Sequence, residues 1–377
     1  MKVSVLCFDC SENAAGRADL LARLLRPEYE AEVVGPCFKG EVWAPVNGGS
    51  VKYRTVRGSK YPAFLATRRS LVRLADGDLL YASKPRPTSY GVGLLARMAR
   101  QRPLLLDIDD WEVGFFYRSG AWGRLGRLLN VANPNGLPWT WLMERLTGRA
   151  QAVTVASRFL QQRFGGVLIP HARDTDEWRP ERYRPEAGRG RLGVSSERVV
   201  MFLGTPRVHK GIDDLAEAMR LLARPDVVLV VVGCAPESAR ARAFAGLGRG
   251  VRLVPEIPFT EVPLYLAAAD VVAIPQRLGP DTVGQVPAKV FDAMALGRPI
   301  VSTRVSMIPE ILEDCAVLVG PGDPAGLARG IAWLLDHPGE AAALGRKARE
   351  RSVARYSYAS ARRLLFPVIE RVLRKSL

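Results

Sequence analysis

Short apolar runs alternate with stretches of helical periodicity along the first half of the chain. The apolar runs have the length of buried strands, and the periodic stretches repeat apolar residues every three to four positions. This alternation is typical of α/β proteins with parallel sheets, which bind ligands at the carboxyl ends of their strands. We therefore expect an α/β fold. The predicted strands are residues 2–8, 30–34, 78–83 and 103–107, and the predicted helices are residues 15–25 and 91–100.

A strand, a cationic turn and a helix form the most informative unit of the second half. The apolar run Val199–Leu203 is followed by the turn and then by a helix from Ile212 to Leu222 with one apolar face. Glycines let backbone N–H groups approach an anion, the start of a helix offers the positive end of its dipole, and Arg207 and Lys210 add full charges. The unit predicts a phosphate-binding site, with an ordinary turn carrying solvated basic residues as the alternative. The turn is Gly204-Thr205-Pro206-Arg207-Val208-His209-Lys210-Gly211.

A second unit follows the apolar run Val271–Pro275. After a loop at residues 276–286, a short helix is predicted between Pro287, which suits the first helical position, and Gly297, which suits the C-terminal cap. Asp292 lies in the middle of this helix among apolar residues, where a carboxylate is costly to bury unless it accepts hydrogen bonds. The hydroxyl groups of a ligand could donate them.

From about residue 150 to its C-terminus, the chain resembles the retaining glycosyltransferases of family 4, which are glycosyl transferases of group 1. The likeness rests on the two units above and on further segments in the same order. One of these resembles the segment I-P-N-G-V-D-x-x-x-F-x-P that joins the two domains in that family. The resemblance implies the GT-B fold, in which two Rossmann-like domains with parallel sheets face each other across a cleft. The further segments are Ile169–Pro180, Asp270–Pro275, Pro309–Ile311 and Leu318–Asp323.

The resemblance implies a nucleotide diphosphate sugar as donor, with the basic residues of the turn gripping its diphosphate. The family usually has arginine directly after the glycine, whereas this chain has Thr205 there and Arg207 two places later. Lys210 keeps the family position. Gly204, Thr205 and Gly211 are then expected to line the donor site, with Arg207 and Lys210 as catalytic residues.

The same resemblance implies two carboxylates eight residues apart, the first near the sugar ring and the second on the nucleotide ribose. Asp292 takes the second position, and Gly284 takes the first. Two sources for the missing contact stay open. Asp281 is the nearest carboxylate on the loop, and the backbone amides around Gly284 and Gln285 are the other source. The Pro287-x-Lys289 pair resembles a variant branch of the family, which implies that Lys289 also meets the diphosphate.

Two domains are expected from this resemblance. The first is an acceptor-binding domain at residues 1–180 that is joined by the C-terminal helix at about residues 356–377. The second is a nucleotide-sugar-binding domain at residues 181–355. The boundary is placed near residues 179–191, because several prolines, arginines and a glycine interrupt regular structure there. The apolar stripe of the terminal helix is expected at Leu364, Val368 and Val372.

A carboxylate cluster at residues 107–112 follows a predicted strand of the first domain, which places it at the carboxyl edge of the sheet. Asp109 and Asp110 are expected to bind the acceptor or to accept its proton. The alternative is a D-x-D metal motif with a divalent cation on the donor diphosphate. The basic phosphate turn favours a metal-independent site, so no metal or cofactor is expected. No catalytic histidine can be assigned in this region.

Aromatic residues and glycines crowd the stretch from residue 111 to residue 146. Such rings stack on sugar faces or anchor at a membrane interface, and the alternative is an insertion that packs its own rings. A functional stretch would indicate a bulky or amphiphilic acceptor, and peripheral association with the inner membrane face stays open. The rings are Phe115, Phe116, Tyr117, Trp122, Trp139 and Trp141.

Composition agrees with a globular enzyme of two domains. The 377 residues carry a formal charge of +16, are 48% hydrophobic and contain no apolar run long enough for a membrane span. The arginines are spread along the chain, and no nucleic-acid-binding module is recognisable. The apolar N-terminus is predicted to be a strand rather than a signal peptide, so a cytoplasmic location is expected. Cys7 and Cys10 have the C-x-x-C spacing of redox sites, but their place at the end of a strand favours buried thiols, with redox or metal chemistry as the alternative.

These observations predict a glycosyltransferase of the hexosyltransferase type. It would move a sugar from a nucleotide diphosphate sugar to an acceptor hydroxyl with retention of configuration. Two alternatives stay open. One is a catalytically silent nucleotide-binding protein of the same fold, because Thr205 and Gly284 stand at two positions where the family has functional side chains. The other is a nucleotide-sugar epimerase or hydrolase.

Overall fold

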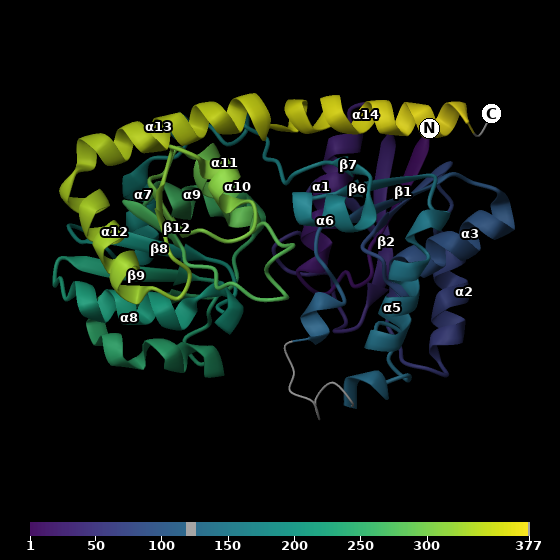
Figure 1. Ribbon diagram of the computed structural model, residues 1–377, viewed down its shortest axis with the longest axis horizontal. Coiled ribbons are helices and arrows are strands. Elements are labelled where there is room, and N and C mark those ends of the chain that lie inside the picture. The colour runs from purple at the N-terminus through teal and green to yellow at the C-terminus, as the bar shows by residue number, and fades with distance from the viewer. Residues whose placement is uncertain (118–125, 376–377) are drawn as a thin grey trace. The chain divides into compact units, whose positions relative to one another are not determined.

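The structure is a computed structural model that describes residues 1–117 and 126–375 (Figure 1). The chain divides into two compact units. Unit 1 comprises Met1–Pro170 and Ala361–Leu377, and unit 2 comprises His171–Ser360. The chain passes into unit 2 directly after Pro170, so the Pro- and Arg-rich segment at residues 179–191 lies within unit 2. The chain returns to unit 1 within its last helix.

Unit 1 contains a seven-stranded parallel sheet in the order β3-β2-β1-β4-β5-β6-β7 among the described residues. Its strands are β1 (Lys2–Leu6), β2 (Glu30–Cys37), β3 (Lys52–Arg57), β4 (Leu79–Ser83), β5 (Leu104–Ile108), β6 (Ala152–Val155) and β7 (Val167–Leu168). Its helices are α1 (Ala14–Leu25), α2 (Phe64–Leu74), α3 (Val92–Arg100), α5 (Leu137–Arg145) and α6 (Arg158–Phe164), joined by most of α14 (Tyr358–Arg374).

Unit 2 contains a six-stranded parallel sheet in the order β10-β9-β8-β11-β12-β13. Its strands are β8 (Arg198–Leu203), β9 (Val227–Val232), β10 (Val251–Val254), β11 (Val271–Ile274), β12 (Ile300–Thr303) and β13 (Val317–Val319). Its helices are α7 (Pro185–Leu192), α8 (Ile212–Leu222), α9 (Val262–Ala267), α10 (Ala288–Ala295), α11 (Ile308–Leu312), α12 (Pro324–Asp336) and α13 (Pro338–Arg355).

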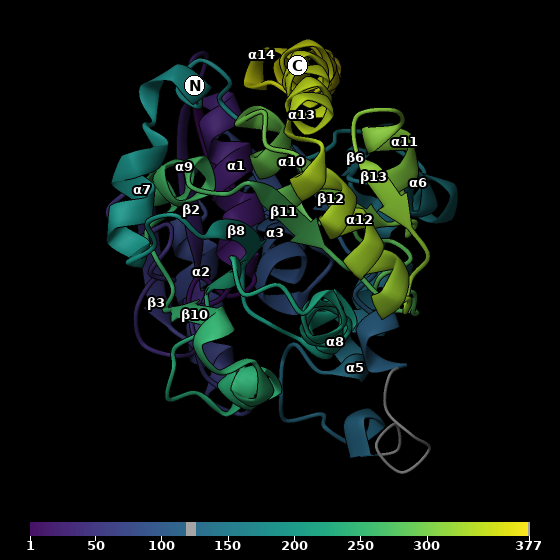
Figure 2. The ribbon, with the colours of Figure 1, turned by 90° about the vertical axis from the view of Figure 1, so that its left-hand side faces the viewer.

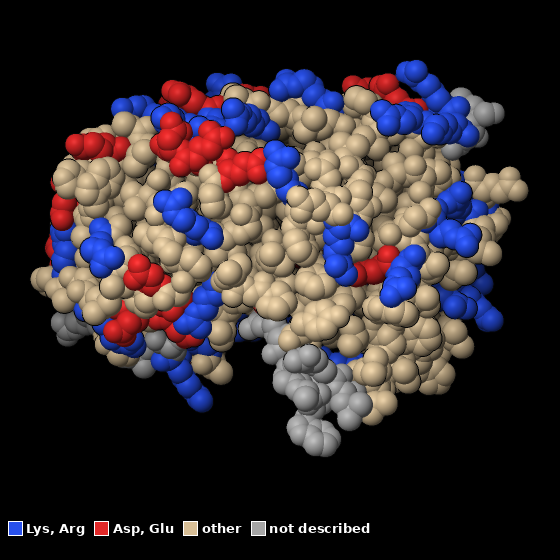
Figure 3. All heavy atoms as spheres, in the orientation of Figure 1, with Lys and Arg blue, Asp and Glu red and all other residues tan. Residues whose placement is uncertain are grey.

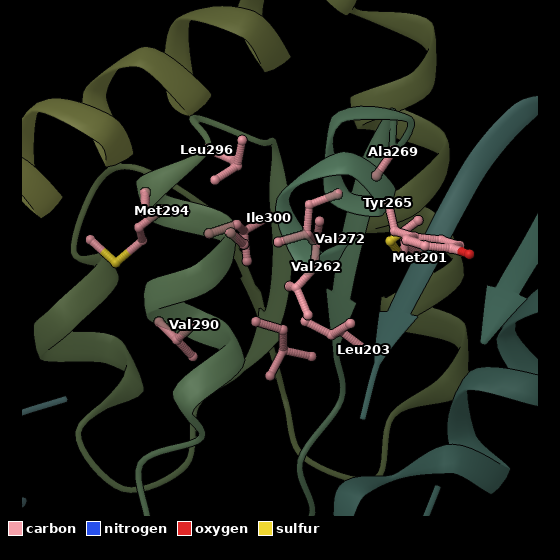
Figure 4. Packing of buried hydrophobic residues seen from close by; sticks show 14 of the residues in the cluster. Met201, Leu203, Val262, Tyr265, Ala269, Val272, Val290, Met294, Leu296 and Ile300 are labelled. Atoms are coloured by element: carbon pink, nitrogen blue, oxygen red, sulfur yellow. The ribbon is translucent and has the colours of Figure 1, made fainter. Parts of the chain in front are cut away.

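Both faces of the unit 2 sheet are buried, because helices cover each face. Along β8, Met201 and Leu203 point into the cluster that includes α9 and α10, while Val200 and Phe202 point into the cluster that includes α8 and α12. Figure 2 shows α10 and α13 over one face of the sheet and α8 and α12 over the other. Figure 4 shows the first of these clusters from close by. Burial on both faces explains why these strands read as continuous apolar runs.

The predicted α/β fold with two parallel-sheet units is confirmed, and the strands and helices expected in the first half all form within a few residues of their predicted ends. The terminal helix is a partial exception. Val368 and Val372 are buried as expected, but Leu364 is 44% exposed and Leu365 is fully buried instead. Three residues at successive spacings of four drift around a helix of 3.6 residues per turn, which carries Leu364 off the buried face.

The surface charges, the helices and the cysteines can also be compared with what the sequence predicts. On the face drawn in Figure 3, lysine and arginine side chains are spread out rather than gathered in one patch. Among the described residues, no helix is both long and apolar enough to cross a membrane. All five cysteines are buried free thiols, which confirms the expectation for Cys7 and Cys10.

Candidate functional site

The phosphate turn of unit 2 lies where the strand order of the sheet reverses. From β8 the chain continues to β9 on one side, and from the neighbouring β11 it continues to β12 on the other side. In open parallel sheets this reversal leaves a crevice at the carboxyl ends of the two strands, which is the usual ligand-binding place. The turn at residues 204–211 follows β8, and the loop at residues 275–287 follows β11. The turn and the loop that the sequence singled out therefore lie at the same edge of the unit 2 sheet.

Two glycines shape the turn. Gly204 has φ of +102°, and Gly211 has φ of +71°, a region that side chains with a Cβ rarely adopt. A Cβ built on Gly211 would lie 1.6 Å from the carbonyl oxygen of Pro275, so the turn presses directly on the end of β11. A Cβ on Gly204 would lie 3.7 Å from Lys210 Nζ, which places the ammonium over the start of the turn. Lys210 and Arg207 are both half-buried.

Lys289 adds a second ammonium at the first turn of α10. The side chain is 8% exposed, and its Nζ lies 3.5 Å from the centroid of the Phe202 ring. No described residue accepts a hydrogen bond from this Nζ. Burial, and then the charge of Lys210, lower the pKa of Lys289 well below its ordinary value, while Asp292 opposes them. A buried cation without an acceptor is costly unless a ligand supplies the missing negative charge.

Asp292 lies one helical turn after Lys289 and is 4% exposed. Burial raises the pKa of Asp292 above its ordinary value, and Arg173 opposes this shift. The Nε of Arg173 donates to Oδ1 of Asp292 in a buried ion pair. The protein therefore provides the hydrogen bond that the sequence led us to expect from a ligand. Pro287 also differs slightly from its predicted place, because it is the residue before the helix rather than its first residue.

The loop after β11 brings Asp281 to the phosphate turn. Asp281 is 6% exposed, and its Oδ2 lies 3.6 Å from Nδ1 of His209. On the same loop, Arg277 donates to both carboxylate oxygens of Asp214 at the start of α8, with an Nε to Oδ2 distance of 2.7 Å. These contacts tie the loop to the turn and to the following helix.

The remaining residues expected in the donor site also lie near this edge, but Gln285 and Thr205 make contacts within the protein. The backbone amide of Gln285 donates to the carbonyl oxygen of Thr282 at 3.0 Å, so this amide is already used within the loop. Gly284 is buried beside it. The hydroxyl of Thr205 lies 3.4 Å from a carboxylate oxygen of Glu256.

A separate charge cluster lies at the carboxyl edge of the unit 1 sheet. Lys84 directly follows β4, has φ of +73° and is 6% exposed. Its ammonium forms ion pairs with Asp109 at 3.1 Å, with Glu112 at 2.9 Å, and with Asp110. Burial lowers the pKa of Lys84, but the three carboxylates outweigh this effect and raise the pKa well above its ordinary value. A positive φ in a residue other than glycine is costly and often marks a functional site.

Two arginines support this cluster. The Nε of Arg86 donates to Glu112 at 2.8 Å, and its guanidinium lies 5.2 Å from the centroid of the Phe8 ring. Arg17 donates to both oxygens of Asp107, at 2.9 and 2.8 Å, so Asp107 is neutralised separately. Lys84 and Arg86 thus face three carboxylates, which leaves an excess of one negative charge. Burial raises the pKa of Asp109 to about 7, against the attraction of Lys84.

The aromatic stretch of unit 1 mostly packs against its own surroundings. Trp111 lies 5.7 Å from the Phe159 ring, and Trp139 donates from Nε1 to the carbonyl oxygen of Val131 at 2.8 Å. Trp141 is 49% exposed, and the guanidinium of Arg145 lies 4.4 Å from its ring centroid. Trp122 lies outside the described residues. The contacts of Trp111 and Trp139 support a packed insertion, whereas Tyr117 and Trp141 are each 49% exposed.

The structure thus brings together two groups of the expected site residues, each within its own unit. The turn, Lys289, Asp292 and Asp281 gather in unit 2, and Asp109 and Asp110 gather in unit 1. Sequence reasoning missed Arg173, Lys84 and Arg86. Arg173 stands where the joining segment of the resembled family has valine, and Lys84 and Arg86 directly follow a central strand. The departure from the family at Arg173, and the place of Lys84 and Arg86 after a central strand, could have pointed to these residues.

Comparison with known proteins agrees with this geometry. Residues 197–337, which contain the turn, the loop and α10, match the family model described as "Glycosyl transferases group 1". The predicted resemblance to the group 1 glycosyltransferases is confirmed over these residues. The chain is 27% identical over 340 residues to the "GDP-mannose-dependent alpha-(1-6)-phosphatidylinositol monomannoside mannosyltransferase" of Mycolicibacterium smegmatis, covering 84% of each chain. It is 27% identical over 303 residues to the "GDP-mannose-dependent monoacylated alpha-(1-6)-phosphatidylinositol monomannoside mannosyltransferase" of Corynebacterium glutamicum, covering 72% of this chain and 78% of the relative.

Solved structures support the fold of the glycosyltransferase. It superposes on the sucrose-phosphate synthase from Thermosynechococcus elongatus with a TM-score of 0.77 and 18% identity, covering 100% of both chains. It superposes on Anabaena HepE in complex with UDP-glucose with a TM-score of 0.73 and 20% identity, again over 100% of both chains. At these identities the likeness concerns the fold alone.

Replacing Gly211 by alanine tests the contact between the turn and β11. The added Cβ would overlap the Pro275 carbonyl oxygen and meet an unfavourable φ, so we expect a loss of about 3 kcal/mol or more in the free energy of unfolding. Urea denaturation measures it. Gly190→Ala is the matched control, because a Cβ at Gly190 in α7 meets nothing within 4 Å. Equal stability of the two variants would contradict the tight contact.

Replacing Asp109 by asparagine tests the burial of its charge. The pKa of Asp109 is raised to about 7 in the folded chain, so folding favours its protonated form. The free energy of unfolding of the wild type should therefore fall, relative to Asp109→Asn, as pH rises from about 4 to 7. We expect a relative fall on the order of 2 kcal/mol. Urea denaturation across this range measures it, and a constant difference between the two proteins would contradict the shift.

Proposed function

We propose that this glycosyltransferase moves a glycosyl unit from a nucleoside diphosphate sugar to an acceptor hydroxyl, with retention of anomeric configuration. The observation that carries the proposal is the buried ammonium of Lys289, which has no acceptor among the described residues and lies near Lys210. Two cations kept close together against their repulsion indicate that an anion belongs between or beside them. The turn after β8 and the start of α10 supply the place for it.

The proposed role of these cations is to stabilise the leaving diphosphate. Negative charge grows on the diphosphate as the glycosyl unit departs, and fixed positive groups in a water-poor site lower the energy of that charge. Lys210 and Lys289 hold the diphosphate, and Arg207 replaces the arginine that the resembled family has at the position of Thr205. In this proposal the side chains do what a divalent metal ion does in other transferases, so no metal is required.

Asp292 is proposed to accept a hydrogen bond from the nucleoside ribose. It lies on α10 one turn after Lys289, so a nucleoside diphosphate lying along the start of the helix can reach both side chains. Asp281 and the loop around Gly284 are proposed to line the sugar. This arrangement follows the resemblance, with Asp281 taking over for the missing first carboxylate.

The charge cluster of unit 1 is proposed to serve the acceptor. Asp109, with a pKa raised to about 7, can hold or accept a proton near neutral pH. Asp110 is paired with the same Lys84 and would bind an acceptor hydroxyl. The half-exposed Trp141 beside Arg145 supports a bulky or amphiphilic acceptor, and a cytoplasmic enzyme acting at the inner membrane face remains part of this proposal.

Retention of configuration is supported by the names of the relatives. Two of them are GDP-mannose-dependent enzymes that form alpha linkages. Because the mannosyl bond in GDP-mannose is itself in the α configuration, an α-linked product means retention. Incubation with GDP-mannose, UDP-glucose and related donors plus an acceptor panel tests the function. Proton NMR of the product reports its anomeric configuration, and a β-linked product from an α-linked donor would overturn retention. Release of free sugar without an acceptor would indicate a hydrolase instead.

Replacing Lys210 by alanine should lower turnover by one to two orders of magnitude, since a charge that stabilises the leaving diphosphate is lost. Steady-state kinetics with the active donor measures it. Lys39→Ala is the control, because the Lys39 side chain is 69% exposed in unit 1 and only forms a surface ion pair with Glu12. Unchanged turnover in a folded Lys210→Ala protein would refute the role of the turn.

Replacing Lys289 by methionine should change binding and stability in opposite directions. Affinity for a nucleoside diphosphate should fall at least about tenfold, because a charge-assisted contact is lost. The free energy of unfolding should stay the same or rise by about 1 kcal/mol, because an ammonium without an acceptor is no longer buried. Isothermal titration calorimetry and urea denaturation measure the two effects. Normal binding together with lower stability would show that Lys289 serves the fold.

A further inference from the structure

We propose that Arg173 is a positioning residue for the donor: it holds the Asp292 carboxylate ionised and oriented so that its second oxygen receives the nucleoside ribose. The inference rests on the proposed donor site and goes beyond it, because Arg173 belongs to the segment that joins the two units. It acts through Asp292 and is not expected to touch the reacting atoms.

The ion pair engages one oxygen of the carboxylate and leaves the other for a ligand. Nε of Arg173 donates to Oδ1 of Asp292, and no described residue donates a hydrogen bond to Oδ2. Both side chains are buried, with 5% of Arg173 and 4% of Asp292 exposed. A carboxylate has enough lone pairs to serve an arginine on one oxygen and a hydroxyl on the other.

Arg173 is itself held in place from several sides. Its backbone N–H donates to the carbonyl of Tyr356 at 3.0 Å, and its carbonyl accepts from the N–H of Tyr358 at 2.9 Å. Its Nη1 donates to the Ala172 carbonyl at 2.7 Å. The guanidinium also lies over two aromatic rings, at 5.6 Å from Trp178 and 5.1 Å from Phe259. A guanidinium fixed in this way can fix the carboxylate that it binds.

Two departures from the resembled family occur together at this contact. The family has valine where this chain has Arg173, and it has glutamate where this chain has Asp292. Aspartate is one methylene shorter, so its carboxylate sits closer to the buried backbone of α10. Burial favours the neutral acid and raises the pKa of Asp292, and the adjacent guanidinium opposes this shift. The arginine thus compensates for the shorter and more buried acid.

The groups that face Asp292 determine its protonation. They are Arg173 from the joining segment and Lys289 from α10 itself, and both favour the carboxylate. The rings of His171, at the start of unit 2, and of Tyr356, after α13, lie 5.9 and 5.1 Å from the neighbouring Phe291 ring. Without Arg173, the pKa of Asp292 should rise further, and ribose binding should weaken as pH falls through the raised value.

The experiment measures binding by isothermal titration calorimetry between pH 6 and pH 8.5. The ligands are GDP or UDP, whichever binds the wild type, and inorganic pyrophosphate. Arg173→Met should weaken nucleoside diphosphate binding about tenfold at pH 7.5, with a larger loss at pH 6, since one charge-supported contact is worth about that much. Pyrophosphate has no ribose, so its affinity should change by less than about threefold. Arg173→Lys should restore part of the affinity and flatten the pH profile.

Three further variants separate the positioning role from a structural one. Asp292→Asn should lower nucleoside diphosphate affinity without strong pH dependence. In the double variant Arg173→Met/Asp292→Asn, the effect of losing Arg173 should vanish, because the two residues act as a unit. This double variant removes both charges of the Arg173–Asp292 pair and leaves neither one buried without its partner, so it keeps the test valid if Arg173→Met fails to fold. His171→Gln controls for histidine titration and should leave the pH profile unchanged.

The outcomes distinguish this inference from the proposed function. If the wild type binds neither GDP, UDP nor pyrophosphate, the donor site itself is wrong. If the wild type binds a nucleoside diphosphate and Arg173→Met binds it equally well at every pH, the positioning role is overturned. An equal loss for pyrophosphate and for the nucleoside diphosphate would also overturn it, since Arg173 would then act on the phosphates.

Discussion

A buried positive charge that the protein leaves without an acceptor organises the second unit. Lys289 is held against Phe202 and near Lys210, and both burial and that neighbour disfavour its charged form. Folding alone gives no reason to retain such a group, because methionine would fill the space at less cost. The turn after β8, with Gly211 pressed on Pro275, holds the two cations at the carboxyl edge of the sheet. The proposed diphosphate would supply the negative charge that this edge lacks.

In the first unit, by contrast, the buried charges are paired with one another. Lys84 is surrounded by Asp109, Asp110 and Glu112, and Arg86 completes the network, so most of the charge is neutralised inside the protein. What remains is one excess negative charge and an acid that titrates near neutrality. One unit therefore presents unmet positive charge, which suits an anionic donor. The other unit holds a network of nearly balanced charges, which suits a neutral hydroxyl that has to lose its proton.

The sequence predicted those parts of the fold in which local pattern and burial agree. Strands buried on both faces, such as β8, read as apolar runs, and the helix after the turn showed its face through Ile212, Leu215 and Met219. The edge strand β3 was missed, because most of its residues are half-buried or exposed and polar, so it has no apolar run. In the site, the basic turn and α10 could be found from glycine, charge and spacing. Arg173 could not, because its partner Asp292 is far away along the chain and only the fold brings them together.

The backbone contacts of Arg173 have a consequence for the architecture of the whole chain. Arg173 pairs with Ser357, so the stretches that lead into and out of unit 2 run side by side as a short parallel bridge. Unit 2 thus begins and ends at one place, and in topological terms it is an insertion within unit 1. Domains whose ends meet in this way can be excised, transplanted or exchanged without long linkers. Such a layout lets one unit be combined with different partner domains while its own fold stays the same.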